Sequence, residues 1–143
     1  MRKRRVLVVD DDNLLAKILQ KILEQNGFAV ESASEGRTAL RMIPKFRPDL
    51  VILDVMMPVD NGCRVSRIIK TLVQVTGVHV PKVLLLTARR LDHDPAGERA
   101  FLEQSLADGM MYKPYDHAVL LARINDLLAN QSRPLSMAGG LQE

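Results

Sequence analysis

Four places in the chain carry side chains that could do chemistry together, and each comes directly after an apolar run. They are the three consecutive aspartates Asp10–Asp12, the single aspartate Asp54, and the residues Thr87 and Lys113. Two carboxylates that converge to roughly 4 Å repel each other by about 4 kcal/mol at an effective dielectric constant of about 20, so protons or a cation must relieve the charge. All-oxygen ligands suit Mg²⁺. A hydroxyl and an ammonium group beside such a cation are the parts that phosphoryl transfer requires.

The aspartate run also has a purely structural interpretation, the capping of the helix that follows it. The side chain of Asp12 or Asn13 can accept hydrogen bonds from the first N–H groups of that helix, and an acid there favours the helix dipole. Capping, however, needs one acid and not three followed by Asn13. We therefore expect a metal site at this point of the chain.

The elements that would position these residues alternate between apolar runs and helical periods. The runs are typical of strands; they lie at Val6–Val9, Leu50–Leu53, Val83–Leu86 and Met110–Tyr112, and a weaker one starts at Phe28. Apolar residues recur at helical spacing between the runs, over about 14–23, 34–42, 65–73, 98–107 and 118–128, and the second helix is expected to stop near Pro44. Five strands alternating with five helices predict a parallel sheet covered on both faces. Ligands of such sheets bind beyond the carboxyl ends of the strands, where the four places fall.

Length and composition describe one globular domain. The 143 residues are 47% hydrophobic and 26% charged, an ordinary balance that excludes disordered and fibrous chains. The net charge is +3, but four basic residues lie together at 2–5, which we interpret as a solvated tail and not as a site for nucleic acid. The apolar runs fall far short of the ~20 residues that span a bilayer, and no secretory signal is evident. The single cysteine, Cys63, is interpreted as an inert thiol, and a cytoplasmic location is expected.

Taken together, the motifs resemble the signature set of response-regulator receiver domains of bacterial two-component signalling. The matching segments, in the family's order, are Val8–Asp11, Ile52–Pro58, Leu86–Ala88 and Lys113–Pro114. The resemblance covers about residues 5–128. It implies an α/β fold, a single doubly wound (βα)5 flavodoxin-like domain with a parallel five-stranded sheet of order 2-1-3-4-5. We expect a receiver domain at 1–128 and a flexible tail or truncated linker at 129–143.

The resemblance implies a Mg²⁺ site and a phospho-acceptor. Asp54 matches the residue that takes a phosphoryl group from the phosphohistidine of a sensor kinase. Asp10, Asp11 and Asp54 match the metal-binding acids, with Asp10 usually acting through water. The backbone carbonyl of Met56 matches a further ligand.

The remaining matches concern the phosphoryl group and its consequences. Thr87 and Lys113 match the hydroxyl and the ammonium group that contact it, and Pro114 matches a proline that is typically preceded by a cis bond. In the family, phosphorylation shifts the surface of the fourth helix, fifth strand and fifth helix. The resemblance thus implies a signalling switch without an outside substrate, and not an enzyme.

The expected partners follow from the same resemblance. They are a sensor histidine kinase or phosphotransfer protein and a downstream protein target or missing output domain. A homodimer that forms on phosphorylation is a further expectation. Neither direct binding of nucleic acid nor contact with a membrane is expected.

The chain departs from the family pattern at Met110 and in loop length, and two further positions bear on the lifetime of the phosphorylated form. Met110 stands three positions before Lys113, where the family has Tyr or Phe, so the usual coupling between the threonine and an aromatic ring is expected to differ. The segment 89–97 reads as an enlarged loop beside the expected output surface. Met56 and Arg89, two positions after Asp54 and Thr87, are bulky enough to hinder an attacking water, and we hypothesise a long-lived phosphorylated form.

One alternative from another class remains at this point. The run Asp10–Asp12 also satisfies the Asp-x-Asp motif of Mg²⁺-dependent phosphatases of the haloacid-dehalogenase type, in which Asp10 would be the nucleophile. That class needs another acidic strand end after the lysine and usually a cap domain. After Lys113 the chain offers Asp116 and the helical Asp126.

Overall fold

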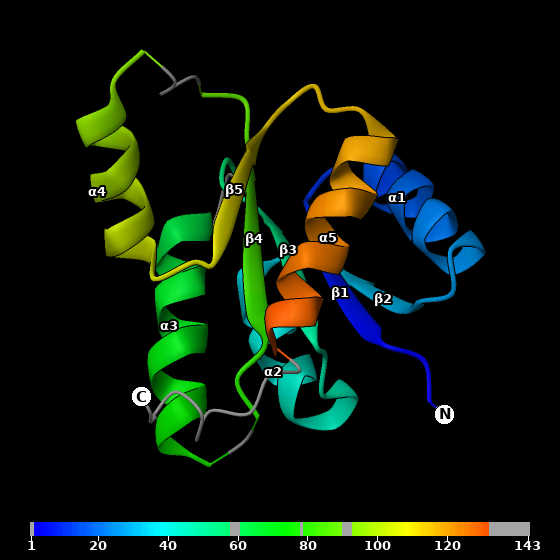
Figure 1. The fold of residues 1–143 in the computed structure, drawn as a ribbon. Coiled ribbons are helices and arrows are strands. Elements are labelled where there is room, and N and C mark those ends of the chain that lie inside the picture. The colour runs from blue at the N-terminus through cyan, green and yellow to red at the C-terminus, as the bar shows by residue number, and fades with distance from the viewer. Residues whose placement is uncertain (1, 58–60, 78, 90–92, 132–143) are drawn as a thin grey trace, which may run out of the picture.

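The chain folds into a sheet of five parallel strands with five helices (Figure 1). The computed structural model describes residues 2–57, 61–77, 79–89 and 93–131. The strands are β1 (Arg5–Val9), β2 (Ala29–Ala33), β3 (Leu50–Asp54), β4 (Lys82–Thr87) and β5 (Gly109–Tyr112). The helices are α1 (Asn13–Gln25), α2 (Gly36–Phe46), α3 (Gly62–Val75), α4 (Pro95–Ser105) and α5 (His117–Gln131).

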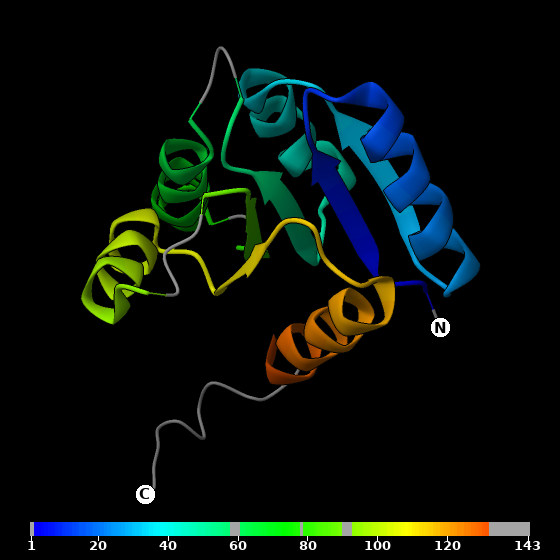
Figure 2. The ribbon, with the colours of Figure 1, turned by 90° about the horizontal axis from the view of Figure 1, so that it is seen from above.

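The strand order is β2-β1-β3-β4-β5, and all four pairings are parallel, which confirms the expected topology. Helices α1 and α5 cover one face of the sheet, and α2, α3 and α4 cover the other (Figure 2). Alternate residues of the central strands enter the two cores: Val8 and Ile52 pack toward α1 and α5, whereas Leu7 and Leu53 pack toward the other helices. Because both faces are covered, these strands are apolar throughout.

Two helices differ from the sequence prediction at their ends. Helix α2 continues past Pro44 to Phe46, because the N–H of Arg47 donates to the carbonyl of Ile43 at 2.8 Å and closes another turn. Arg47 itself adopts a left-handed conformation and ends the helix. Helix α4 begins at Pro95, because the side chain of Asp94 accepts a hydrogen bond from the N–H of Gly97. It ends before residue 107 because Leu106 turns left-handed, with φ of 60°.

Helix α5 extends past residue 128, where the sequence placed the end of the domain, to Gln131. Residues 132–143 of the expected tail lie outside the described residues. In the described part of the chain, no helix is long and apolar enough to cross a membrane.

Candidate functional site

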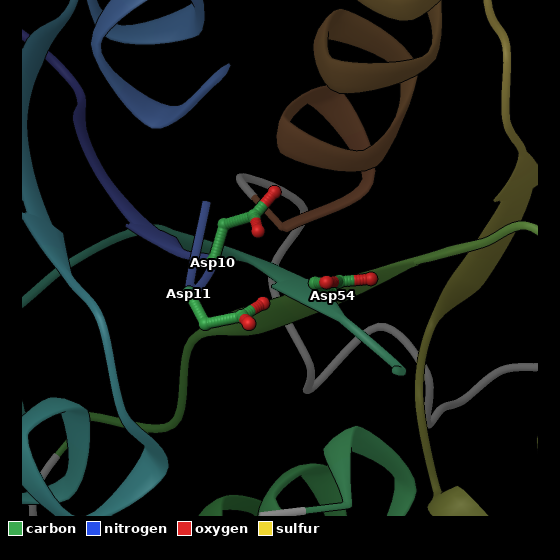
Figure 3. Close-up of side chains that lie close together, drawn as sticks. All are labelled: Asp10, Asp11 and Asp54. Carbon is green, nitrogen blue, oxygen red and sulfur yellow. The ribbon is translucent and has the colours of Figure 1, made fainter. Parts of the chain in front are cut away.

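Neighbouring strands bring the predicted residues together at the carboxyl edge of the sheet. Asp10 follows β1, Asp54 ends β3 and Thr87 ends β4, while Lys113 comes directly after β5. Carboxylate oxygens of Asp10, Asp11 and Asp54 all lie within 4.8 Å of one another (Figure 3). In the part of the chain that the structure describes, this is the one group of three or more acidic, histidine or cysteine side chains close enough to hold a metal ion.

The three consecutive aspartates have different tasks. The side chain of Asp12 accepts hydrogen bonds from the N–H groups of Leu14 and Leu15, each at 3.1 Å, and so caps α1. The N–H of Asp12 in turn donates to Asp10 Oδ1 at 2.9 Å and orients that carboxylate. Capping and cation binding are therefore compatible, because different aspartates serve them. Asp10 is 7% exposed and Asp11 is open to solvent.

Lys113 places its ammonium group between the two buried acids. Its Nζ lies 3.3 Å from Asp54 Oδ1 and 3.7 Å from Asp10 Oδ2. The backbone N–H of Lys113 donates to the carbonyl of Thr87 at 2.8 Å, which ties the end of β5 to the end of β4. The bond between Lys113 and Pro114 is cis, as the resemblance implied. One half-buried ammonium group thus faces a cluster of three carboxylates.

The protonation of this cluster reflects its burial. Burial raises the pKa of Asp54. The positive charge of Lys113 lowers this pKa only in part, and the negative charge of Asp10 raises it further. Burial acts to lower the pKa of Lys113, but the charges of Asp54 and Asp10 outweigh it and leave that pKa above its ordinary value. The charged form of Lys113 is therefore stabilised by the nearby carboxylates. Three carboxylates face one ammonium group, so the cluster has an excess of negative charge that a cation would neutralise.

Thr87 and Met56 complete the surroundings of Asp54. Thr87 is 1% exposed, and its Oγ1 accepts a hydrogen bond from the N–H of Arg89 at 3.0 Å. The N–H of Met56 donates to Asp54 Oδ1 at 3.3 Å, while the Met56 side chain is 63% exposed. The described residues thus place one buried hydroxyl and one exposed apolar side chain near Asp54.

Gly62, which is not among the predicted site residues, lies against the end of β3. A Cβ atom added there would collide with the carbonyl oxygen of Asp54 and lie 2.7 Å from the Cα of Val55. The N–H of Gly62 also donates to the carbonyl of Val55 at 3.1 Å. The first turn of α3 can approach the end of β3 because this residue has no side chain. The sequence signal was a glycine eight positions after the expected acceptor, without a visible contact to explain it.

Met110 takes the place of the family's aromatic residue, and an aromatic side chain follows two positions later on the same strand, at Tyr112. Met110 is buried and packs in the core under α3 and α4, and Tyr112 lies on the same side of β5. The hydroxyl of Tyr112 donates to Glu98 in the first turn of α4. Tyr115 packs instead toward the α1 and α5 core. An aromatic residue of β5 therefore reaches α4 from position 112.

Two further predictions concern α3 and the loop before α4. Cys63 is half-buried, and burial raises the pKa of its thiol although the nearby charge of Arg89 lowers it, which agrees with an inert thiol. Of the enlarged loop expected at 89–97, residues 90–92 lie outside the described residues.

Comparisons with known proteins give one consistent result. The family model of the response regulator receiver domain matches residues 6–125. The response regulator MprA of Mycolicibacterium vanbaalenii is 43% identical over 124 residues, which are 87% of this chain and 50% of that protein. MprA of Mycobacterium leprae is 41% identical over 124 residues with the same coverage. The chain spans about half the length of these curated relatives.

Solved structures agree with the sequence relatives. The signal receiver domain of a signal transduction histidine kinase from Syntrophus aciditrophicus has a TM-score of 0.74 and 32% identity, covering 92% of this chain and 94% of that one. The receiver domain of the Francisella response regulator 1452 has a TM-score of 0.74 and 26% identity, covering 90% of this chain and 99% of that one. These matches give no support to the phosphatase alternative.

Proposed function

Because this chain belongs to the response regulator receiver domain family and is a phospho-accepting switch of two-component signalling, we propose that Asp54 is its acceptor. The observation that carries the proposal is the convergence of Asp10, Asp11 and Asp54 within 4.8 Å, with Lys113 3.3 Å from Asp54. The proposed acceptor, the two further carboxylates and the lysine thus come from the ends of β3, β1 and β5 at one edge of the sheet. No outside substrate is required, since the domain is itself the phosphorylated species.

The donor set fits Mg²⁺. Asp10, Asp11 and Asp54 supply hard oxygen ligands, and the backbone carbonyl of Met56 would add another. When bound, the cation would neutralise the carboxylates and the oxygens of the incoming phosphoryl group. Asp10 is oriented for this task by the N–H of Asp12.

The chain's own residues define the rest of the transfer. A carboxylate oxygen of Asp54 attacks the phosphorus atom of a phosphohistidine on the sensor kinase; an O–P bond forms, the N–P bond breaks, and the electron pair returns to the imidazole nitrogen. Lys113, held between Asp54 and Asp10, compensates the negative charge on the phosphoryl oxygens. Thr87 Oγ1, which now accepts from the N–H of Arg89, would donate its proton to a phosphoryl oxygen.

Incubation with acetyl phosphate tests this assignment. Intact-mass and peptide-mapping spectrometry should find one phosphoryl group on Asp54 when Mg²⁺ is present and none when it is absent. The Asp54→Asn variant should remain unlabelled. A label on Asp10, or turnover of acetyl phosphate that does not depend on Asp54, would instead assign the chain to phosphatase chemistry.

The partners of the whole protein follow from the family and from the length of the relatives. We infer that a sensor histidine kinase or a phosphotransfer protein supplies the phosphoryl group, in the cytoplasm. The output would pass through the face formed by α4, β5 and α5, to an output domain, a separate protein or a second copy of this chain. Phosphorylation-dependent dimerisation would be seen as a mass shift in light scattering after treatment with acetyl phosphate and Mg²⁺.

A further inference from the structure

The positive charge of the molecule is concentrated on two adjacent helices. Neither α2 nor α3 contains an aspartate or a glutamate, whereas their sequences hold six basic residues: Arg37, Arg41, Lys45, Arg64, Arg67 and Lys70. Both helices cover the same face of the sheet (Figure 2). Since the net charge of the whole chain is only +3, the rest of the molecule is acidic on balance. The basic tail at residues 2–5 is therefore not the main basic feature of the fold.

These basic side chains fall into two groups. Lys70 forms an ion pair with Asp108 at 2.5 Å, and Arg67 donates to the carbonyl of Gln104 at 2.9 Å. Both side chains therefore have partners within the chain. Within the described ranges, no ion pair involves Arg37, Arg41 or Arg64. The uncompensated charge thus lies on α2 and on the first turn of α3.

A groove runs between the two helices where this charge is found. Its volume is about 420 Å³, and its apolar lining comes from Leu40 of α2 and from Val65 and Ile68 of α3. Arg37 and Arg64 line it as well, one from each helix. Leu40 and Ile68 are only half-buried, so an incoming apolar side chain could cover them.

We propose that this α2–α3 groove binds an acidic protein segment, in which an apolar side chain fills the groove and carboxylates on either side pair with Arg37 and Arg64. Guanidinium groups bind carboxylates through two parallel hydrogen bonds, and amphipathic segments commonly place apolar anchors into grooves between helices. The apolar lining favours a peptide over nucleic acid, because phosphate recognition would not require it. The groove is separate from the acidic cluster and from the α4, β5 and α5 face, so this surface goes beyond the proposed phosphorylation.

Two matched double variants distinguish binding in the groove from a general effect of the protein's charge. Arg37→Gln combined with Arg64→Gln removes two charges from the groove. Lys21→Gln combined with Arg99→Gln removes two charges from exposed positions on α1 and α4. Both double variants should be phosphorylated by acetyl phosphate at the wild-type rate, which shows that they are folded and keeps this test independent of the acceptor site.

A library of random 12-residue peptides displayed on phage is selected against the wild-type protein and counter-selected against Arg37→Gln/Arg64→Gln. Surviving peptides should be acidic and carry at least one large apolar residue. Synthetic copies should bind about tenfold more weakly to the groove variant, since each exposed charge pair contributes a factor of a few, while the control variant binds like the wild type. The proposal is overturned if no peptide depends on the two arginines or if dependent peptides are not acidic. It is also overturned if a single-stranded 20-nucleotide DNA shows the same arginine dependence with higher affinity.

Discussion

At the scale of single residues, burial disfavours the ionised form of Asp54, the proposed acceptor. Asp54 is 5% exposed, and burial raises its pKa above the ordinary value of 3.8. The native state therefore binds this proton more tightly than the unfolded chain does. The associated stability is fully present below the unfolded pKa and is lost as the pH rises through the raised pKa of the folded state. At neutral pH and without a cation, the ionised acceptor destabilises the domain.

Asp54→Asn should accordingly raise the free energy of unfolding by about 1 kcal/mol at neutral pH in metal-free buffer. Lys113 keeps an acidic partner in this variant, because Asp10 lies 3.7 Å from its Nζ. The gain should shrink as the pH is lowered and vanish below 3.8, where the wild-type carboxyl becomes protonated in the unfolded chain as well as in the folded state. Urea unfolding followed by circular dichroism measures the difference. A variant less stable than the wild type at neutral pH would contradict the assigned electrostatics.

The stabilisation of the folded state by Mg²⁺ provides a second comparison between the wild type and Asp54→Asn. At a concentration ten times its dissociation constant, a cation bound only by the folded state stabilises it by about 1.4 kcal/mol. The wild type should gain this stability, and Asp54→Asn should gain clearly less because one ligand is missing. Equal gains would mean that the cation binds elsewhere.

The lifetime of the phosphorylated form is a second property set by single side chains. Met56 is exposed beside Asp54, and the N–H of the exposed Arg89 contacts the hydroxyl of Thr87. If these side chains hinder an attacking water, Met56→Ala combined with Arg89→Ala should speed loss of the phosphoryl group roughly tenfold, a barrier decrease of about 1.4 kcal/mol. The decay is followed by mass spectrometry after removal of acetyl phosphate. Arg99→Ala, on the surface of α4, serves as the control and should decay at the wild-type rate. A fast decay in the wild type itself would remove the basis of the hypothesis.

At the scale of elements, the position of α3 determines where the acceptor can lie. The space for a side chain at position 62 is already occupied by backbone atoms of Asp54 and Val55, which cannot move as the end of a flexible side chain could. Gly62→Ala should push the first turn of α3 away from β3, cost about 1–3 kcal/mol of stability and slow phosphorylation by acetyl phosphate about tenfold or more.

Gly77→Ala supplies the matched control for this prediction. Gly77 has a φ of +80°, so alanine there is strained, but no atom lies within 4 Å of the added Cβ. This variant should lose stability by about 1 kcal/mol and keep the wild-type rate of phosphorylation. Similar rates for both variants would show that Gly62 serves the turn alone.

At the scale of the whole molecule, the sequence predicted most of the fold because local pattern and topology agree. The central strands β1, β3 and β4 are buried on both faces, so their apolar runs are continuous. The order of a parallel sheet places residues such as Asp10 and Asp54 at one edge. The contacts of Gly62 and the paired arginines of the α2–α3 groove could not be predicted, since they depend on distances between elements. The end of α2 beyond Pro44 was missed because the proline does not prevent the hydrogen bond from the N–H of Arg47 to the carbonyl of Ile43, which closes another turn.

The connection from the acidic cluster to α4 also depends on contacts between elements. Within the described residues of α4, only Ser105 is fully buried, while Phe101 and Leu102 pack partly against the core. The hydroxyl of Tyr112 ties the first turn of this helix to the strand that ends beside Lys113. A weakly buried helix that contacts this strand through the Tyr112 hydroxyl is suited to respond when the charge at Asp54 changes.

Tyr112→Phe should therefore affect both the stability of α4 and the phosphorylation of the site. Loss of the contact with Glu98 should speed amide hydrogen exchange in α4, as measured by mass spectrometry. If phosphorylation favours a state in which that contact is broken, a variant without the contact should be phosphorylated more readily. Thermodynamic reciprocity makes this increase equal to the factor by which phosphorylation weakens the contact in the wild type. A several-fold higher phosphorylated fraction at limiting acetyl phosphate is expected. Faster exchange in α4 with an unchanged phosphorylated fraction would show that the Tyr112 hydroxyl only anchors the helix, and the signal would then have to reach α4 through the packing of Met110.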